Sequence, residues 1–330
     1  MSAPERGGTT TYLESIRQGL WEEMEADERV FVLGEDVGDY GGAFKVTDGF
    51  LDRFGEARVI DTPISEGAIV GAAVGAAMMG LKPVAEMQFI DFISCAFDQL
   101  TNVAAKSRYR WGAGVPIVVR GPSGGGVHGG PFHSLQAESY FANTAGLKIV
   151  CPATPYDAKG LIKAAIRDDD PVIFQEHKYL YRRIKEDLPE DDFVVPLGKA
   201  RIARTGADAS ILTWAAMVHV ALEAAEVLAD DGVEVEVVDL RTLVPLDEEA
   251  VLKSVAKTGR AIVLHEAPRT GGFGGEIVAT IAEKAFEYIE APIVRVTAPD
   301  TPVPYSPPLE EFYLPGSDDV VQMVKRIVDY

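Results

Sequence analysis

Short runs of β-branched residues alternate with stretches of helical length along almost the whole chain, and this alternation constrains the fold more than any other feature. Strands that alternate with helices form βαβ units, whose parallel sheets are covered by helices on both faces. We therefore predict an α/β fold with doubly wound, mostly parallel sheets. The predicted strands are 30–33, 84–87, 116–120, 147–150, 172–175, 209–213, 233–238, 261–264 and 293–296, and the predicted helices are 96–109, 156–167, 217–229, 247–256, 275–287 and 318–328.

The alternation is interrupted between Tyr181 and Val195, where charged residues and proline replace the apolar runs. Such a composition is typical of a linker between domains. The length of 330 residues is sufficient for two domains with separate cores. We predict a first α/β domain at 1–185, a linker at 186–200 and a second, smaller α/β domain at 201–330.

Charge and targeting patterns restrict the partners and the compartment. The 51 acidic residues outnumber the 31 basic ones, and the net charge of −20 argues against binding to nucleic acid or an anionic membrane, although it suits a basic protein partner. The longest uncharged apolar run, 68–81, is shorter than the roughly 20 residues that span a bilayer, so we expect no membrane segment. Cys95 and Cys151 are too few for a disulfide framework, and the N-terminus lacks a targeting pattern, so we expect a cytoplasmic protein.

Ligands of doubly wound sheets bind to the loops that follow the strands, and one such loop contains Ser65 and Glu66. Ser65 is a candidate helix N-cap, and the helix dipole favours a carboxylate such as Glu66 in the first turn, so capping is the simpler interpretation and a ligand-binding carboxylate the alternative. Gly67, Gly71 and Gly75 follow at intervals of four residues. Because glycine disfavours helix, this stripe indicates either a close contact with a second helix, such as one from another subunit, or packing against the chain's own sheet.

Two further loops combine polar and aromatic residues. In 86–92, acidic, amide and aromatic side chains suit a heteroaromatic ligand, although Phe92 could equally be an ordinary core residue. The glycine-rich segment 121–134 contains His128 and His133 and lacks the Gly-Lys-Ser/Thr ending of a phosphate-binding P-loop. A histidine in such a loop is suited to proton transfer, and a mobile connection is the alternative.

Taken in order, these segments resemble the beta subunit of the decarboxylating component of 2-oxoacid dehydrogenase complexes, a thiamine diphosphate enzyme. The resemblance extends from about residue 10 to the C-terminus and implies a transketolase-like fold, with a pyrimidine-binding domain followed by a transketolase C-terminal domain. The matching stretches are Leu33-Gly-Glu-Asp-Val-Gly, Asp61-Thr-Pro-Ile-Ser-Glu, Ala85-Glu-Met-Gln-Phe-Ile-Asp-Phe, Phe97-Asp-Gln, Phe132-His-Ser, Asp157-Ala-Lys-Gly-Leu, Val238-Asp-Leu-Arg-Thr, Lys257-Thr-Gly-Arg and His265-Glu-Ala-Pro.

The resemblance implies roles for individual residues. Glu66, with its pKa raised by burial, would hydrogen-bond the N1′ atom of the aminopyrimidine ring of the cofactor. Phe92 would pack against that ring, and Gln88 would belong to the same cofactor site. His133 would handle protons while the lipoyl group reacts, and His128 would line the substrate cavity. The resemblance also implies a monovalent cation, K⁺, on main-chain oxygens of Ile117, Ala165, Ile166, Asp168 and Asp170.

The chain lacks the residues that hold the other half of this cofactor. In the superfamily, Gly-Asp-Gly and a later Asn-Asn pair hold the diphosphate and Mg²⁺, whose preferred ligands are oxygens. This chain has no Gly-Asp-Gly, and Asn102 and Asn143 are its two asparagines. The resemblance therefore implies that a separate alpha subunit supplies the diphosphate half with Mg²⁺. One departure is Leu135, which directly follows Ser134 where family members usually have glutamine.

The implied enzyme contains two alpha and two beta chains, decarboxylates a 2-oxo acid and transfers the acyl group to the lipoyl domain of a dihydrolipoyl acyltransferase core. The runs that begin at Gln88, Arg108 and Lys178 are closer to branched-chain members than to pyruvate members, so a branched-chain 2-oxo acid is slightly favoured. The alternatives are an acetoin dehydrogenase or another split thiamine enzyme, and a non-catalytic scaffold that binds the acyltransferase core. The presence of Glu66, Phe92 and His133 disfavours the scaffold.

Overall fold

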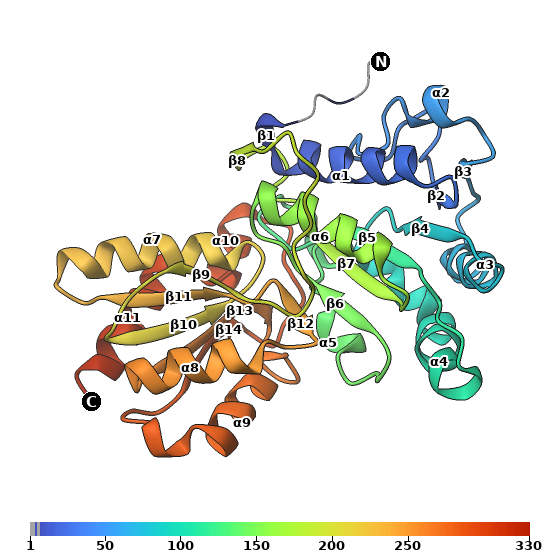
Figure 1. The fold of residues 1–330 in the computed structure, drawn as a ribbon. Helices are drawn as coiled ribbons and strands as arrows, with labels where there is room; N and C mark the ends of the chain where they lie inside the picture. Colours follow the sequence, from blue (N-terminus) through green and yellow to red (C-terminus); the bar gives the residue numbers. More distant parts are fainter. Residues whose placement is uncertain (1–3, 5–6) are drawn as a thin grey trace. The chain divides into compact units, whose positions relative to one another are not determined.

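The computed structural model describes residue 4 and residues 7–330, and the chain divides into two compact units (Figure 1). Unit 1 comprises Met1–Ser123 and Tyr140–Leu197, and unit 2 comprises Gly124–Ser139 and Gly198–Tyr330. The boundary after Leu197 falls inside the linker predicted at 186–200. The glycine-rich segment Gly124–Ser139 belongs to unit 2, however, whereas the sequence prediction included it in the first domain. The physical reason is that carboxylates of unit 2 hydrogen-bond its main-chain N–H groups.

Unit 1 contains a parallel sheet in which its strands follow the order β6-β7-β5-β4-β2-β3. The register places Gly34, Asp61 and Glu86 beside one another, so the carboxyl ends of three strands meet at one edge. All the strands predicted for this part of the chain are confirmed, and β3 is an addition. The bounds are β2 (Val30–Gly34), β3 (Val59–Asp61), β4 (Lys82–Glu86), β5 (Val118–Ser123), β6 (Lys148–Val150) and β7 (Val172–His177).

Helices cover both faces of this sheet, as the doubly wound pattern predicts. Helices α1 (Tyr12–Ala26) and α6 (Pro155–Arg167) pack together on one face, and α3 (Glu66–Met78) packs on β4 from the other. The side chains of Thr11 and Thr154 cap α1 and α6 by accepting hydrogen bonds from main-chain N–H groups at 3.2 Å. The core between sheet and helices includes Leu20, Trp21, Met24, Val84, Val118, Leu161, Ile162 and Phe174.

The prediction of a helix at 96–109 is wrong for the first half of that range. The chain forms a 3₁₀ segment, η1 (Ile90–Ala96), then a π-helical segment, η2 (Gln99–Ala104), and only then helix α4 (Ala105–Trp111). The hydroxyl of Thr101 donates to the carbonyl of Phe97 at 2.9 Å, so a side chain competes for a carbonyl that a regular helix would use. Local helical propensity therefore does not produce one straight helix here.

Two short strands of unit 1 lie outside its main sheet. Strand β1 (Gly8–Thr11) pairs antiparallel with β8 (Lys185–Leu188), which begins at the end of the predicted first domain. Strand β8 carries charged residues in an extended stretch, so the sequence pattern indicates a linker there rather than a strand. Helix α2 (Phe50–Phe54) is a single short helix whose Phe50 packs edge-on against Trp21 at 5.1 Å.

Unit 2 has a second sheet, in the order β14-β13-β10-β11-β9, which is parallel except for β9. Helices α7 and α11 pack on one face and α8 and α9 on the other (Figure 1). The α/β class predicted for both domains is confirmed. The bounds are β9 (Arg201–Arg204), β10 (Ala209–Thr213), α7 (Met217–Asp230), β11 (Val235–Asp239), β12 (Thr242–Val244), α8 (Glu248–Thr258), β13 (Ala261–Pro268), α9 (Gly274–Lys284), η4 (Phe286–Tyr288), β14 (Val294–Ala298), α10 (Pro307–Tyr313) and α11 (Ser317–Val328).

The core of unit 2 contains a buried histidine, His265, which stacks on Trp214 with ring centroids 5.3 Å apart. Burial, together with the positive charges of Arg295 and Arg269, lowers the pKa of His265 to about 4, so the ring is neutral near pH 7. A Cβ atom at Gly274 would lie 2.6 Å from this ring. Glycine at the start of α9 therefore lets the helix approach the histidine.

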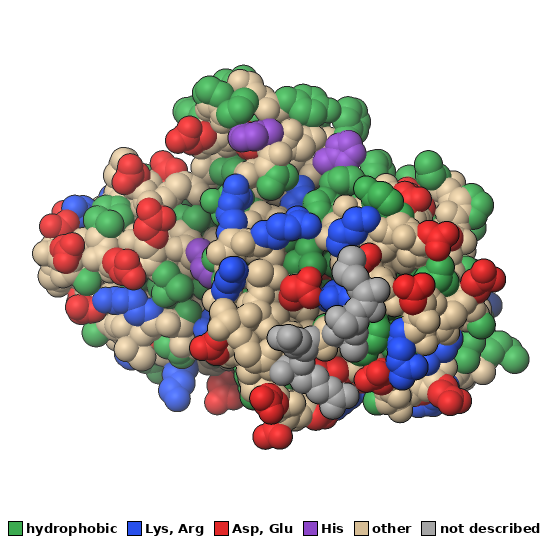
Figure 2. Space-filling model, turned by 90° about the horizontal axis from the view of Figure 1, so that it is seen from above, with side chains coloured by type: hydrophobic (Ala, Val, Ile, Leu, Met, Phe, Trp, Pro, Cys, Tyr) green, Lys and Arg blue, Asp and Glu red, His purple; other side chains and the backbone are tan. Residues whose placement is uncertain are grey.

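Both acidic and basic side chains are exposed on the face seen in Figure 2. Among the residues that the structure describes, no helix has both the length and the apolar character needed to cross a bilayer. The two cysteines, Cys95 and Cys151, are both unbridged.

Candidate active site

The strand edge of unit 1 gathers polar side chains from three successive loops. Gln88, just beyond β4, donates from Nε2 to Oδ2 of Asp36, just beyond β2, at 2.8 Å. Glu66 is half-buried and is the first residue of α3. Ser65 occupies the N-cap position as predicted, but its hydroxyl donates to the carbonyl of Pro63 and makes no capping bond. The predicted residues Glu66 and Gln88 thus follow β3 and β4, which flank β2 and end at the same edge of unit 1.

Glu35 is a buried carboxyl at this edge that sequence reasoning did not single out. Its side chain is 7% exposed, and its Oε1 atom has no hydrogen-bond partner among the described residues. Burial, and then the negative charge of Glu66, raise the pKa of Glu35. Glu35 is therefore a buried carboxyl with a raised pKa beside Glu66, and the predicted role of Glu66 toward the pyrimidine stays a prediction. The sequence signal that could have indicated Glu35 is its position in the family stretch Leu33-Gly-Glu-Asp-Val-Gly.

An aromatic wall adjoins these carboxyls. Phe92 is half-buried and meets Phe89 edge-on at 6.4 Å between ring centroids, and Phe89 meets Phe44 in the same way at 5.6 Å. Apolar rings and carboxyls that follow strand ends of the same sheet suit a heteroaromatic ring with N–H donors. The residues present therefore fit the aminopyrimidine of thiamine diphosphate.

A buried ion network lies beneath this edge. Arg120 on β5 forms ion pairs with Glu86 at the end of β4 and with Glu176 on β7, all three being 5% exposed or less. The hydroxyl of Tyr181 donates to Glu176 at 2.7 Å. Because buried charges require partners, this network holds the ends of three strands together directly below Gln88.

The predicted histidines lie in unit 2, on the segment Gly124–Ser139. The carboxylate of Glu310 on α10, 1% exposed, accepts hydrogen bonds from the main-chain N–H groups of Gly126 at 2.9 Å and of His128 at 3.0 Å. It also pairs with Nδ1 of His128 at 2.7 Å. Glu266 accepts from the N–H of Gly125 at 2.5 Å. Two carboxylates therefore set the conformation of the loop, and His128 adopts a left-handed φ of 60°.

His133 lies three residues after Gly130, where this loop comes very close to the ring of Tyr305. Gly130 has φ 67°, and a Cβ atom there would lie 2.1 Å from the ring of Tyr305, so only glycine fits. His133 is half-buried, and its main-chain N–H donates to the carbonyl of Gly130 at 3.3 Å. Leu135, at the departure from the family pattern, accepts from the N–H of Gly124 at 3.1 Å through its carbonyl. The loop is therefore closed by main-chain bonds that do not depend on the side chain at 135.

The segment Gly124–Ser139 itself contains a buried carboxyl, that of Glu138. Glu138 is fully buried, and burial raises its pKa to about 7, with the charge of Glu266 adding to the effect. Neither Glu138 nor Glu310 could be found from sequence, because Glu138 follows no motif and Glu310 stands in a proline-dense tract far along the chain. Their importance depends on contacts within unit 2.

Two of the main-chain oxygens predicted for K⁺ have hydrogen-bond partners in the structure. The carbonyl of Ile166 accepts from Nζ of Lys82 at 2.9 Å, and that of Ile117 accepts from the N–H of Val172 at 2.9 Å. Asp168 pairs with Lys148 at 2.6 Å through its side chain. A carbonyl oxygen has two lone pairs, so these bonds leave one lone pair for a cation.

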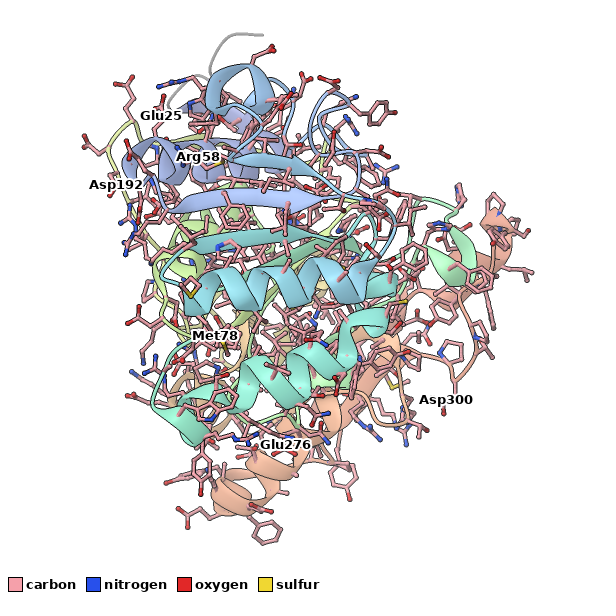
Figure 3. All side chains as sticks on the ribbon, turned by 90° about the vertical axis from the view of Figure 1, so that its right-hand side faces the viewer. Glu25, Arg58, Met78, Asp192, Glu276 and Asp300 are labelled. Carbon is pink, nitrogen blue, oxygen red and sulfur yellow. The ribbon has the colours of Figure 1, made fainter. Side chains whose placement is uncertain are left out.

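The glycine stripe of α3 packs against neighbouring residues at its start and faces open space at its end. A Cβ atom at Gly67 would lie 3.2 Å from the carbonyl of Cys95, and one at Gly71 would lie 3.6 Å from Gln99, whereas Gly75 faces open space. Met78, at the end of the helix, is 42% exposed (Figure 3). The first half of the stripe thus packs against η1 and η2, and the second half leaves the helix surface open.

The fold of the two units defines the class of the protein. Its fold and its polar loops are those of the transketolase superfamily: a model of the transketolase pyrimidine binding domain matches residues 9–183, and one of the transketolase C-terminal domain matches residues 198–320. The chain is also 50% identical to the 2-oxoisovalerate dehydrogenase subunit beta of Bacillus subtilis, over 97% of this chain and 99% of that protein. The chain belongs to the family of 2-oxoacid dehydrogenase beta subunits.

Further relatives agree with this assignment. The chain is 45% identical to the pyruvate dehydrogenase E1 component subunit beta of Bacillus subtilis, over 97% of this chain and 99% of that protein. It is 44% identical to a mitochondrial 2-oxoisovalerate dehydrogenase subunit beta of Arabidopsis thaliana, over 99% of this chain and 91% of that protein. A solved split-gene transketolase, an inactive beta4 tetramer, shares the fold with a TM-score of 0.80 at 22% identity, over 97% of this chain and 98% of that chain.

Proposed function

We propose that this chain is the beta subunit of an α2β2 enzyme that decarboxylates a branched-chain 2-oxo acid and transfers the acyl group to a lipoyl domain of an acyltransferase core. The observation that carries the proposal is the pair of carboxyls Glu35 and Glu66 beside an aromatic wall, at the edge of a sheet whose sequence matches a pyrimidine-binding domain. The 50% identity to a 2-oxoisovalerate dehydrogenase subunit, against 45% for a pyruvate dehydrogenase subunit, supports the substrate class.

Each predicted residue then has a defined task. Thiamine diphosphate, when bound, supplies the carbon nucleophile and the electron sink for decarboxylation. Glu66 shares a proton with the ring nitrogen N1′, and Phe92 and Gln88 orient the pyrimidine. Glu35, buried and without a partner for Oε1, accepts a hydrogen bond from an N–H group of the bound ring. His133 moves a proton at the sulfur of the lipoyl group.

The remaining parts of the proposal concern partners and ions. An alpha subunit holds the diphosphate and Mg²⁺, because this chain has neither Gly-Asp-Gly nor an Asn-Asn pair. K⁺ binds at the carbonyl oxygens of Ile117, Ala165, Ile166, Asp168 and Asp170. His128 lines the substrate cavity. The net charge of −20 suits docking of a basic subunit-binding domain of the acyltransferase core, and the unbridged cysteines suit the cytoplasm.

The test is reconstitution with an alpha chain that contains Gly-Asp-Gly and Asn-Asn, followed by assays with 2-oxoisovalerate, pyruvate and acetoin. We expect the highest kcat/KM with 2-oxoisovalerate. The variant Glu66→Gln keeps the size of the side chain and should lower kcat by at least about 100-fold, the scale of general acid–base catalysis. The matched control, Glu56→Gln, changes an exposed glutamate of the same unit and should leave kcat unchanged.

Assembly is measured in parallel by light scattering, since Glu66→Gln should still form the α2β2 particle. Full activity of that variant would refute the catalytic assignment. Assembly without decarboxylation of any of the three substrates by the unmodified chain would instead support the scaffold alternative, and a preference for acetoin would support the split-enzyme alternative.

A further inference from the structure

A cleft of about 610 Å³ opens in unit 2, and its lining contains none of the predicted catalytic residues. Its walls come from β14, from the residues just beyond β13, and from α10 and α11. Its charged and aromatic lining residues are Arg269, Arg295, Arg326, Asp300, Asp319 and Phe312. A cavity of this volume is in the range of small-molecule sites, which are about 300–1,000 Å³.

Three arginines face this cleft, although the chain carries an excess of twenty negative charges, and the charge of Arg269 acts on the nearby Asp300. Within the described part of the chain, Arg269, Arg295 and Arg326 form no ion pair. Arg269 donates from Nη1 to the carbonyl of Arg295 at 3.1 Å, and Arg295 donates from Nη1 to the carbonyl of Arg269 at 3.0 Å. These reciprocal bonds hold two positive charges close together, an arrangement that an anion would stabilise.

The two acidic side chains of the cleft are committed to local structure. Asp300, labelled in Figure 3, accepts hydrogen bonds from the N–H and the hydroxyl of Thr270 at 2.8 and 2.6 Å. Asp319 accepts from the N–H of Gly316 at 2.9 Å, at the start of α11. The guanidinium groups therefore keep hydrogen-bond donors available for a ligand, since each carries five N–H groups.

The positive charge of the arginines extends into the core of unit 2. Arg295 and Arg269 both lower the pKa of the buried His265, after the larger effect of burial itself. The charges of both arginines therefore reach the buried core of unit 2.

We propose that this cleft binds a small phosphate-bearing ligand of mononucleotide size, with its phosphate groups on Arg269 and Arg295 and its planar base against Phe312. Arginine binds phosphate oxygens with two parallel hydrogen bonds, which suits phosphate better than a single point charge would. The ring of Phe312 is 84% exposed and stands on the same cleft, where it offers a stacking surface. Arg326 on α11 adds a third cation.

The test is isothermal titration of the reconstituted α2β2 enzyme, saturated with thiamine diphosphate so that the cofactor site is filled. ADP is the probe, and inorganic phosphate and an acidic heptapeptide are the comparisons. We expect one ADP per beta chain and weaker binding of inorganic phosphate. Arg295→Ala and Arg326→Ala should each weaken ADP binding at least about tenfold, because each removes charge-assisted hydrogen bonds. Phe312→Ala should weaken ADP binding and leave phosphate binding unchanged.

The matched control is Arg204→Ala, which removes an arginine of the same unit that is paired with Glu234 at 2.6 Å and does not line the cleft. Its ADP affinity should equal that of the unmodified enzyme. No binding of ADP, binding that survives both Arg295→Ala and Arg326→Ala, or tighter binding of the heptapeptide than of ADP would each overturn the proposal. The readout is binding alone, so loss of decarboxylase activity would not affect it.

Discussion

The carboxylate of Glu310 is the contact on which the conformation of the histidine loop depends most. It accepts hydrogen bonds from the N–H groups of Gly126 and His128 and pairs with Nδ1 of His128, all within 3.0 Å. The side chain is 1% exposed, so water does not replace it when it is changed. We therefore predict that Glu310→Gln, which keeps the shape of the side chain and removes its charge, destabilises the closed loop.

The magnitude follows from the bonds to the main chain. A hydrogen bond to a charged group contributes about 1.5–3 kcal/mol, and Glu310 accepts two from N–H groups. The amide oxygen of glutamine can accept one of them, but its NH₂ group would face the other N–H. Loss of one such bond should therefore raise the free energy of the closed loop by about 1.5–3 kcal/mol. That is an increase of roughly 10- to 150-fold in the population of the open loop, at about 1.4 kcal/mol per factor of ten.

Hydrogen exchange of the peptides that cover 124–134 measures this population directly. In the reconstituted enzyme, Glu310→Gln should accelerate exchange at Gly126 and His128 by that factor and leave the core strands unchanged. Glu311→Gln is the matched control, because Glu311 is an exposed neighbour on the same helix. Equal exchange in the unmodified enzyme and in Glu310→Gln would refute the view that this carboxylate holds the loop.

Two further predictions concern stability. Gly130→Ala should reduce the free energy of unfolding by about 2–5 kcal/mol in urea titrations, because the new side chain combines a left-handed φ with a clash against Tyr305. The control is Gly271→Ala, since Gly271 has a similar φ of 70° and open space around it. This variant should reduce the free energy of unfolding by only about 1–2 kcal/mol. Below pH 6.5 the unfolded chain protonates His265, whereas the folded chain does so only near pH 4, so stability falls by about 3 kcal/mol as the pH falls through that interval. Glu138 has the opposite effect, because the folded chain keeps its proton up to about pH 7 and stability falls as the pH rises from 4.5 to 7. The two effects oppose each other between pH 4.5 and 6.5, so thermal melts of Glu138→Gln should show a steeper loss of stability on acidification than the unmodified chain. A pH profile identical to that of the unmodified chain would contradict the assignment to Glu138.

Local pattern was sufficient for the elements with strong periodicity. The buried parallel strands are continuous β-branched runs, so strand β10 was predicted with its bounds, and helix α6 to within one residue. The pattern failed at η1 and η2, where side-chain hydroxyls compete with the helix, and at β8, where a charged strand resembles a linker. In both places the outcome depends on contacts with residues that are distant in the sequence or on side-chain bonds that periodicity does not encode.

The same distinction applies to the candidate site. Glu66, Gln88 and Phe92 could be predicted because they follow strands in motifs that stand together in the sequence, and the structure places them at one edge of unit 1. Glu35 was missed because a glutamate beside an aspartate has no pattern of its own. Its raised pKa results from burial and from the nearby charge of Glu66.

The sequence by itself determined the α/β class, the two-domain organisation and the family, since these depend on periodicity and motif order. Only the tertiary structure decided that the histidine loop belongs to the second unit, that Glu310 holds it, and that three arginines share one cleft. These features depend on bonds between residues as much as 184 positions apart. Folding brings such residues together through packing of whole elements, and no local pattern records the result.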